Sequence, residues 1–302
     1  MLKRGIALPR LLPGLLHNLL SILQNSVLEW LRHRAASKGA ALAFYTLFSL
    51  APILVLVLAI AGFFYGAQAA RGQLFGQLQS LVGQSSASAI QALLAGARDA
   101  EQSRIATMVA SILLLVGATS VFAELKASLD EIWQVPPQEG NSIWFLIRTR
   151  LLSFGLILVL AFLMLVSLVI NAVLTALEYY WGGSKLALAL VFLPLSSLLG
   201  FAVITVLFAV IFKMLPQVRL PWSDVWVGAA GTSALFHAGK YVIGVYIGNS
   251  GVASSFGAAG SMIAILLWVY YSAQIFLLGA EFTRQYAYKL GSLRHTEKLQ
   301  DK

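Results

Sequence analysis

The sequence contains no cysteine, and only 11% of its residues are charged. The absence of cysteine excludes disulfide bonds, cysteine-ligated zinc sites and thiol nucleophiles. The scarcity of charge argues against a soluble domain, because such domains carry about 25% charged residues. Hydrophobic residues make up 59% of the 302-residue chain. This composition predicts a protein that lies mostly in lipid.

Sequence signatures of nucleotide and metal chemistry are also missing. No GxxxxGK[ST] phosphate-binding loop occurs in the chain. Its four histidines do not cluster, and none has the spacing of a metal-ligand set. A ribonuclease is therefore disfavoured. We expect a protein that is not an enzyme, with no catalytic residues, no metal and no cofactor.

Six apolar runs are each long enough for a transmembrane helix, which needs about 20 mostly apolar residues. They occupy residues 39–66, 105–123, 151–177, 186–212, 225–248 and 256–280. The runs are too long and too uniformly apolar for the strands of an outer-membrane barrel. The sequence therefore predicts an all-α fold, a polytopic membrane protein with six transmembrane helices.

Positive charge is distributed unevenly over the two sides of these six spans. Of the 21 Lys and Arg residues, 16 lie in the terminal segments and the second and fourth loops, which share one side. Because Lys and Arg concentrate in cytoplasmic loops, both termini are predicted to be cytoplasmic. The bias also accounts for the net charge of +9 without nucleic acid. The predicted parts are a cytoplasmic segment at 1–38, a transmembrane domain at 39–280 and a basic cytoplasmic tail at 281–302.

Three segments outside the spans have the pattern of amphipathic helices at the membrane surface. Residues 11–33 place leucines at helical spacing with polar residues between them. Residues 67–104, between the first two spans, are expected to hold two short helices on the outer side. Residues 123–133 (AELKASLDEIW) predict a further helix between the second and third spans.

The fifth predicted span contains two titratable residues, His237 and Lys240. A spacing of three places them on one helical face, and a charge inside a bilayer costs at least a few kcal/mol. One hypothesis is a cationic site for an anionic headgroup, with Asn171 or Glu178 of the third span as a partner. The alternative is structural: Lys240 reaches the outer headgroups, and His237 bonds to a neighbouring carbonyl.

A second polar cluster is expected on the cytoplasmic side. Glu281 follows the end of the sixth predicted span, and Gln274 lies two turns further into the membrane. Tyr45 of the first span is at a similar depth and completes the cluster. The alternative for Glu281 is an interfacial charge paired with Arg284 at i+3.

Prolines and small residues interrupt several spans. Pro52 and Pro194 fall inside the first and fourth spans, where each is expected to kink the helix. The runs GAAG at 228–231 and GAAGSM at 257–262 favour close contacts between helices. Kinked helices and glycines are also features of transporters that change conformation.

Several stretches resemble one family of proteins. They are KGAALAFYTLFSLAPILVLVLAIAG (38–62), ELKASLDEIWQV (124–135), LPWSDVWVGA (220–229), GKYVIGVYI (239–247) and WVYYSAQIFLLGAEFTR (268–284). Together they resemble the YihY/BrkB family of bacterial inner-membrane proteins. The resemblance implies six spans and a place in the inner membrane. One branch of that family is associated with serum resistance, another with export of lipid A precursors, and some members carry an old ribonuclease BN name.

The residues and the resemblance lead to two hypotheses. The first is a transporter or facilitator of an anionic lipid or amphiphile, with membrane lipids as partners and Lys240 and His237 at the headgroup. The second is an envelope scaffold that transports nothing. An intramembrane protease built on His237 and Ser261 is disfavoured, because a glycine-flanked serine in a membrane helix is usually a packing residue. An envelope protein partner and a homo-oligomer both stay open.

Overall fold

The computed structural model of the chain describes residues 12–49, 120–136, 193–218, 220–249 and 258–294, with a few single residues between 66 and 91. All regular secondary structure in these ranges is helical, which confirms the predicted all-α fold. The labelled helices are α1 (Leu12–Arg32), α8 (Leu193–Met214), α9 (Trp222–Asn249) and α11 (Ala258–Lys289). Two further helical stretches cover 35–49 and 120–132.

Helices α8, α9 and α11 fall on the fourth, fifth and sixth predicted spans. Within the described ranges, two segments are both long and apolar enough to cross a membrane, Ser197–Met214 and Met262–Lys289. Helix α9 has 28 residues, about 42 Å at 1.5 Å per residue. That length is also sufficient, but the charged and small residues of α9 lower its hydropathy.

Other predicted elements lie wholly or mostly outside the described residues. The third span is not described at all, and only short pieces of the first and second spans are. The two helices expected in 67–104 fall on a stretch with only single described residues. Pro52 is not described, and Pro194 is the second residue of α8, so the residues that would show its kink precede the described range.

Helix α11 continues past the predicted end of the sixth span, as far as Lys289. Glu281 therefore lies inside a helix rather than at its end. The helix stops where the backbone N–H groups of Leu290 and Gly291 both donate to Tyr286 O, at 2.9 Å and 2.8 Å. Such bonds satisfy carbonyls that a helix terminus otherwise leaves free. The predicted basic tail thus begins as the last turns of α11.

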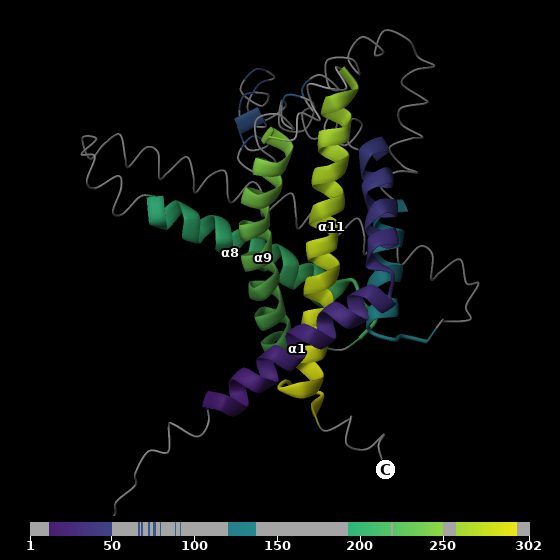
Figure 1. The fold of residues 1–302 in the computed structure, drawn as a ribbon, viewed down its shortest axis with the longest axis vertical. Helices are drawn as coiled ribbons and strands as arrows, with labels where there is room; N and C mark the ends of the chain where they lie inside the picture. Colours follow the sequence, from purple (N-terminus) through teal and green to yellow (C-terminus); the bar gives the residue numbers. More distant parts are fainter. Residues whose placement is uncertain are drawn as a thin grey trace, which may run out of the picture.

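Helices α9 and α11 lie side by side and antiparallel (Figure 1). Gly228 of α9 faces Thr283 of α11, and a Cβ on that glycine would lie 2.6 Å from Thr283 Cβ. The reverse contact occurs one turn away, where Gly279 of α11 faces Thr232 of α9. Each threonine hydroxyl donates at 2.7 Å to the carbonyl of the glycine four residues earlier on its own helix. Small residues thus bring the two backbones close together, as the GAAG run predicts.

Helix α1 crosses the C-terminal part of α11, at the lower end of the view in Figure 1. The chain turns sharply after α1 and continues as the helix at 35–49. Arg34 forms this joint with φ of 52°, a left-handed conformation that is uncommon for a residue other than glycine. The direction of α1 therefore differs from that of the first span.

Helix α1 has one face against the protein and one apolar face exposed. Ile22 and Ser26 are buried, whereas Leu20 and Leu31 are 59% and 60% exposed. Exposed leucines along one side are expected of a helix that lies in the membrane interface. The range and character of α1 agree with the interfacial helix predicted at 11–33.

A hydrophobic core joins α8, α11 and the helix at 120–132. Phe208 and Phe212 of α8 lie against Phe276 of α11, with ring centroids 6.1 Å and 5.2 Å apart. Leu129 and Ile132 are buried in the same core. The predicted amphipathic helix at 123–133 is therefore present. Helix α8 crosses α9 obliquely in Figure 1.

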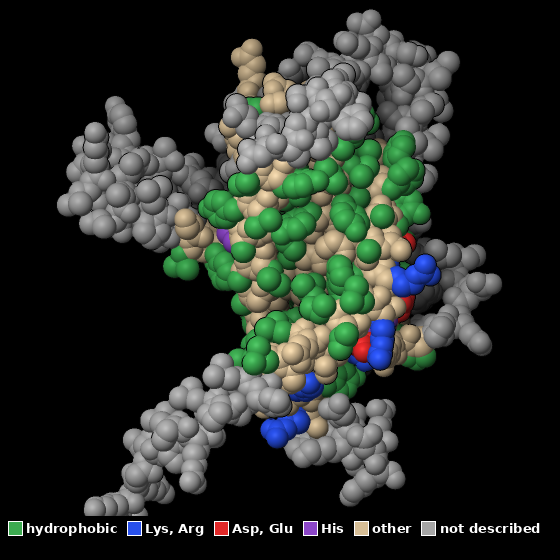
Figure 2. Space-filling model, in the orientation of Figure 1, with side chains coloured by type: hydrophobic (Ala, Val, Ile, Leu, Met, Phe, Trp, Pro, Cys, Tyr) green, Lys and Arg blue, Asp and Glu red, His purple; other side chains and the backbone are tan. Residues whose placement is uncertain are grey.

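Charged side chains gather toward the end of the molecule at which α1 crosses α11, and hydrophobic side chains cover much of the visible face beyond it (Figure 2). Trp222 and Trp226, at the start of α9, are both exposed, with ring centroids 6.4 Å apart. Tryptophan is enriched where a membrane protein meets the lipid headgroups. The start of α9 and the charged end therefore have the features of a membrane–water boundary.

Candidate functional site

The polar residues predicted in the fifth span lie on the second half of α9. His237 Nδ1 donates to Ser233 O at 2.9 Å, so in the neutral ring Nε2 is left as the acceptor. The imidazole also lies near the ring of Phe201 of α8, with centroids 5.6 Å apart. Ser233 Oγ in turn donates to Phe201 O at 3.2 Å, which ties α9 to α8. The bond to Ser233 is the carbonyl contact of the structural alternative.

Lys240 has different surroundings. Its side chain is half-buried, and Nζ lies 5.7 Å from the ring centroid of Tyr241. In the part of the chain that the structure describes, no carboxylate forms an ion pair with it. Tyr241 itself is 71% exposed, and the neighbouring Val242 and Val245 are exposed as well. Among the described residues, Lys240 therefore lies beside an open apolar surface and has the ring of Tyr241 as its contact.

The proposed partners from the third span, Asn171 and Glu178, lie outside the described residues. Their place beside Lys240 stays a prediction. His237 and Lys240 are on one helix three residues apart, so their grouping follows from the sequence alone.

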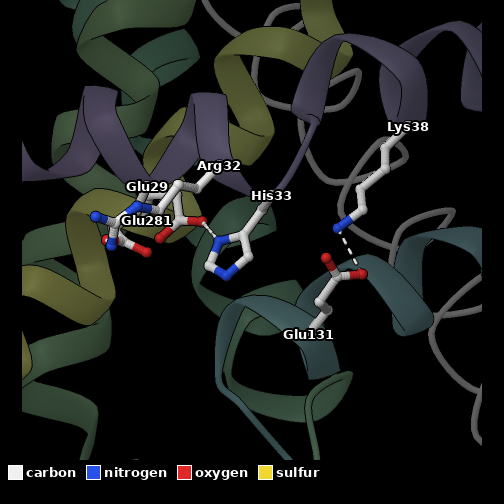
Figure 3. Close-up of polar contacts among 6 residues, drawn as sticks. All are labelled: Glu29, Arg32, His33, Lys38, Glu131 and Glu281. Atoms are coloured by element: carbon white, nitrogen blue, oxygen red, sulfur yellow. Dashed lines mark hydrogen bonds and ion pairs between the residues drawn. The ribbon is translucent and has the colours of Figure 1, made fainter.

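Glu281 is located very differently from the expectation of an interfacial charge. Its side chain is only 1% exposed, and Oε1 lies 2.5 Å from His33 Nδ1 in the turn after α1 (Figure 3). Arg284 is not the partner that bonds to it, since its guanidinium lies over the ring of Tyr288, 5.7 Å from the centroid. The ion pair therefore joins α11 to the N-terminal segment.

The other two members of the second predicted cluster are placed apart. Gln274 Nε2 donates to Ala35 O at 3.3 Å, and Gln274 lies two turns along α11 from Glu281. Gly39 also lies against the Gln274 amide, and a side chain at that glycine would overlap it. Tyr45 instead forms an edge contact with Phe44, with centroids 6.0 Å apart. The structure thus brings Glu281 and Gln274 to the joint after α1, and no described contact brings Tyr45 there.

A second ion pair lies close to this joint. Lys38 Nζ lies 2.8 Å from Glu131 Oε2 and links the helix at 35–49 to the helix at 120–132 (Figure 3). Asp130 pairs with Lys126 on its own helix and accepts a bond from Gln217 N at 3.1 Å. These contacts hold the segment after α1, the helix at 120–132 and the end of α8 together.

Sequence reasoning missed His33, Lys38 and Glu131 as partners. His33 and Glu281 are 248 positions apart, and each has unremarkable neighbours in the sequence. The available signal in the sequence was an acidic residue, Glu281, directly after the apolar stretch FLLGA. That signal indicates that a partner exists, but it does not say which residue supplies it.

Comparison with known proteins gives one family. The family described as virulence factor BrkB matches residues 27–302. A UPF0761 membrane protein of Pseudomonas aeruginosa is 26% identical over 252 residues, which cover 82% of this chain and 58% of the relative. A UPF0761 membrane protein of Neisseria meningitidis serogroup B is 24% identical over 261 residues, covering 85% and 61%.

A third relative, a UPF0761 membrane protein of Alkalilimnicola ehrlichii, is 29% identical over 183 residues, covering 60% of this chain and 39% of the relative. The chain therefore spans less than two thirds of the length of these relatives. No solved structure matches the chain.

Proposed function

Starting from a chain that belongs to the virulence factor BrkB family and is an integral membrane protein like its UPF0761 relatives, we propose that it moves an anionic lipid or amphiphile across the bacterial inner membrane. Lys240 contacts the headgroup, and His237 lies one turn away as a second polar group. No catalysed bond-breaking is part of this function. The membrane lipids are its substrates, and no nucleic acid takes part.

The observation that supports this function is the state of Lys240. Its ammonium group lies in the second half of a membrane-length helix, and no described carboxylate neutralises it. An unpaired cation in a membrane is costly, and an anionic headgroup would remove that cost. The exposed side chains of Tyr241 and Val242 beside it offer an apolar surface for acyl chains.

The test is leaflet exchange in vesicles that contain the purified full chain. A fluorescent phosphatidylglycerol reports movement between leaflets, and a matched phosphatidylcholine reports charge selectivity. We expect protein-dependent exchange of the anionic lipid that falls at least about tenfold in Lys240→Ala, because one lost charge-assisted contact is worth about 1.5–3 kcal/mol. Lys240→Arg retains the charge and should retain exchange. Leu235→Ala, an exposed position elsewhere on α9, is the matched control.

Equal exchange in wild type and Lys240→Ala would contradict the proposal, as would equal movement of both lipids. No exchange by well-folded protein would favour the second candidate, a scaffold in the envelope. The exposed leucines of α1 favour that candidate, since Leu20, Leu23 and Leu31 are each at least half exposed and suit attachment to a membrane surface.

The proposed orientation places the α1 end of the molecule in the cytoplasm. The distribution of Lys and Arg along the sequence supports it. Because the chain has no cysteine, single cysteines can report it directly. In intact spheroplasts a membrane-impermeant maleimide should label Tyr246→Cys and leave Arg32→Cys unlabelled until the cells are lysed. The reverse pattern would invert the orientation.

A further inference from the structure

Glu281 is the most completely buried carboxylate among the described residues, and its two oxygens are not equivalent. Oε1 is bonded to His33 Nδ1 at 2.5 Å. Oε2 is buried and accepts no hydrogen bond from any described group. A buried carboxylate oxygen without a donor is destabilising as long as it carries charge. The site therefore offers one acceptor position that is not filled.

The charges around the pair are limited in number. Arg284 is the nearest cation on α11, and Glu29 acts on Glu281 from α1. Glu29 is itself paired with Arg32 at 2.8 Å. On the helix at 35–49, Lys38 is paired with Glu131. His33 is thus the group that bonds to the Glu281 carboxylate, and it balances that charge fully only when its ring is protonated.

Two other buried groups on these helices lack hydrogen bonds. Trp30 Nε1 of α1 and Arg284 Nε of α11 are buried N–H groups without an acceptor in the described structure. Apart from the His33 bond, Lys289 Nζ donates to Ser21 Oγ at 3.2 Å. Groups that lack partners while α1 is docked gain water when it leaves. The charge state of the His33–Glu281 pair is therefore well placed to decide whether α1 stays docked.

We propose that the His33–Glu281 pair is a proton-binding site at the junction of α1 and α11, and that α1 docks most firmly when the pair holds one shared proton. A further proton from the cytoplasmic water binds Glu281 Oε2 and forms an O–H bond, so the carboxylate becomes a neutral acid and no other bond breaks. The attraction between His33 and Glu281 then falls. At alkaline pH the pair loses its shared proton. His33 is then neutral, and its attraction to the Glu281 carboxylate is weaker. The His33 side chain is 16% exposed and connects the buried carboxyl to water.

Two interacting titratable groups release their protons in coupled steps that belong to the pair. Docking of α1 is therefore strongest at an intermediate pH and weaker on both sides. This behaviour does not require that any lipid is transported. It applies equally to a transporter and to a scaffold.

The test is a distance between α1 and α9, because α9 is joined firmly to α11. Spin labels at Gln24→Cys and Val227→Cys, both exposed positions, are measured across pH with the full chain in lipid nanodiscs. We expect one short-distance population at intermediate pH and a longer one that grows several-fold toward both acid and alkaline pH. Glu281→Gln should remove the acid response, and His33→Gln should remove the alkaline response. Glu131→Gln, at an exposed carboxylate of the neighbouring ion pair, is the matched control and should leave both.

A second measurement covers the case in which Glu281→Gln does not fold. ¹⁵N NMR of the histidine rings in the unaltered chain, assigned with His33→Gln, reports the charge and tautomer of His33 directly. The proposal expects the His33 ring signal to change over the same pH range as the distance. Distances that do not change with pH in the wild type would overturn it, as would an acid response that persists in Glu281→Gln or a His33 signal that does not follow the distance.

Discussion

The protein treats two charged residues of the membrane-length helices α9 and α11 in opposite ways. Glu281 of α11 is 1% exposed and bonded to His33 from a distant part of the chain. Lys240 of α9 is half-buried, and its contact among the described residues is the ring of Tyr241. Both would be expensive in lipid if left alone. The bond to His33 offsets the first cost, and we propose that an anionic headgroup offsets the second.

The difference shows why a charge in a membrane helix is not by itself a binding site. A charge whose partner belongs to the fold fixes the arrangement of helices, here the docking of α1 on α11. A charge without a partner beside an exposed surface is free to contact something from outside. Four changes distinguish these roles.

The largest loss of stability is expected from a change that separates α9 from α11, because it disturbs the surroundings of both Lys240 and Glu281. In Gly228→Val the new side chain would overlap Thr283, and overpacking of this kind costs up to about 3 kcal/mol. We expect a large drop in the thermal midpoint in detergent and little folded protein in membranes. Gly244→Val on the same helix is the control, because nothing lies within 4 Å of a Cβ there. Equal losses in the two variants would mean that the close contact is not important.

Removing only the charge of Glu281 should have a moderate effect on stability. Glu281→Ala leaves His33 without its acceptor and opens a buried space, so we expect a loss of about 2 kcal/mol in the free energy of unfolding. Cleavage by trypsin after Arg34, at the joint, should become faster because α1 is held less firmly. Glu131→Ala, whose side chain is 54% exposed, serves as the comparison. If α1 is as resistant to trypsin in Glu281→Ala as in the wild type, the pair does not hold it.

The neighbouring ion pair should contribute less. Lys38 and Glu131 lie 2.8 Å apart, but Glu131 is 54% exposed, so solvent screens the pair. A double-mutant cycle with Lys38→Met and Glu131→Gln should give a coupling energy below about 1 kcal/mol, and the coupling should shrink in high salt. A coupling as large as that of the buried pair would contradict the ranking by burial.

The smallest effect on stability is expected from a change beside Lys240. Tyr241→Leu removes the ring beside Lys240, and a cation–π contact at an exposed site is worth about 0.5–1 kcal/mol. We expect a shift in unfolding free energy within that range, with Tyr246→Leu as the control on the same helix. A destabilisation of several kcal/mol would show that Tyr241 supports the fold rather than the surface around Lys240.

Much of the fold follows from local sequence patterns. Apolar runs of membrane length fix the positions of α8, α9 and α11, and helical spacing of leucines fixes α1. The sixth span was predicted to end at residue 280, and the helix that contains it continues to Lys289. The bond between Glu281 and His33 lies within that continuation.

The candidate site could be predicted only in part. His237 and Lys240 are three residues apart on one helix, so the sequence alone shows that they lie on the same face. Glu281 and His33 meet because α1 turns at Arg34 and crosses α11, and no local pattern encodes that meeting. Long-range ion pairs of this kind depend on how helices are arranged, so they become visible only in three dimensions.

The exchanged glycines and threonines of α9 and α11 have a mechanical consequence. Two helices that pack closely resist bending more than either helix alone. Here a threonine of each helix packs against a glycine of the other. A change of shape is therefore not expected between these two helices. Arg34, at the joint after α1, has a left-handed backbone conformation, and in the proposed docking equilibrium the α9–α11 pair is the rigid frame against which α1 moves.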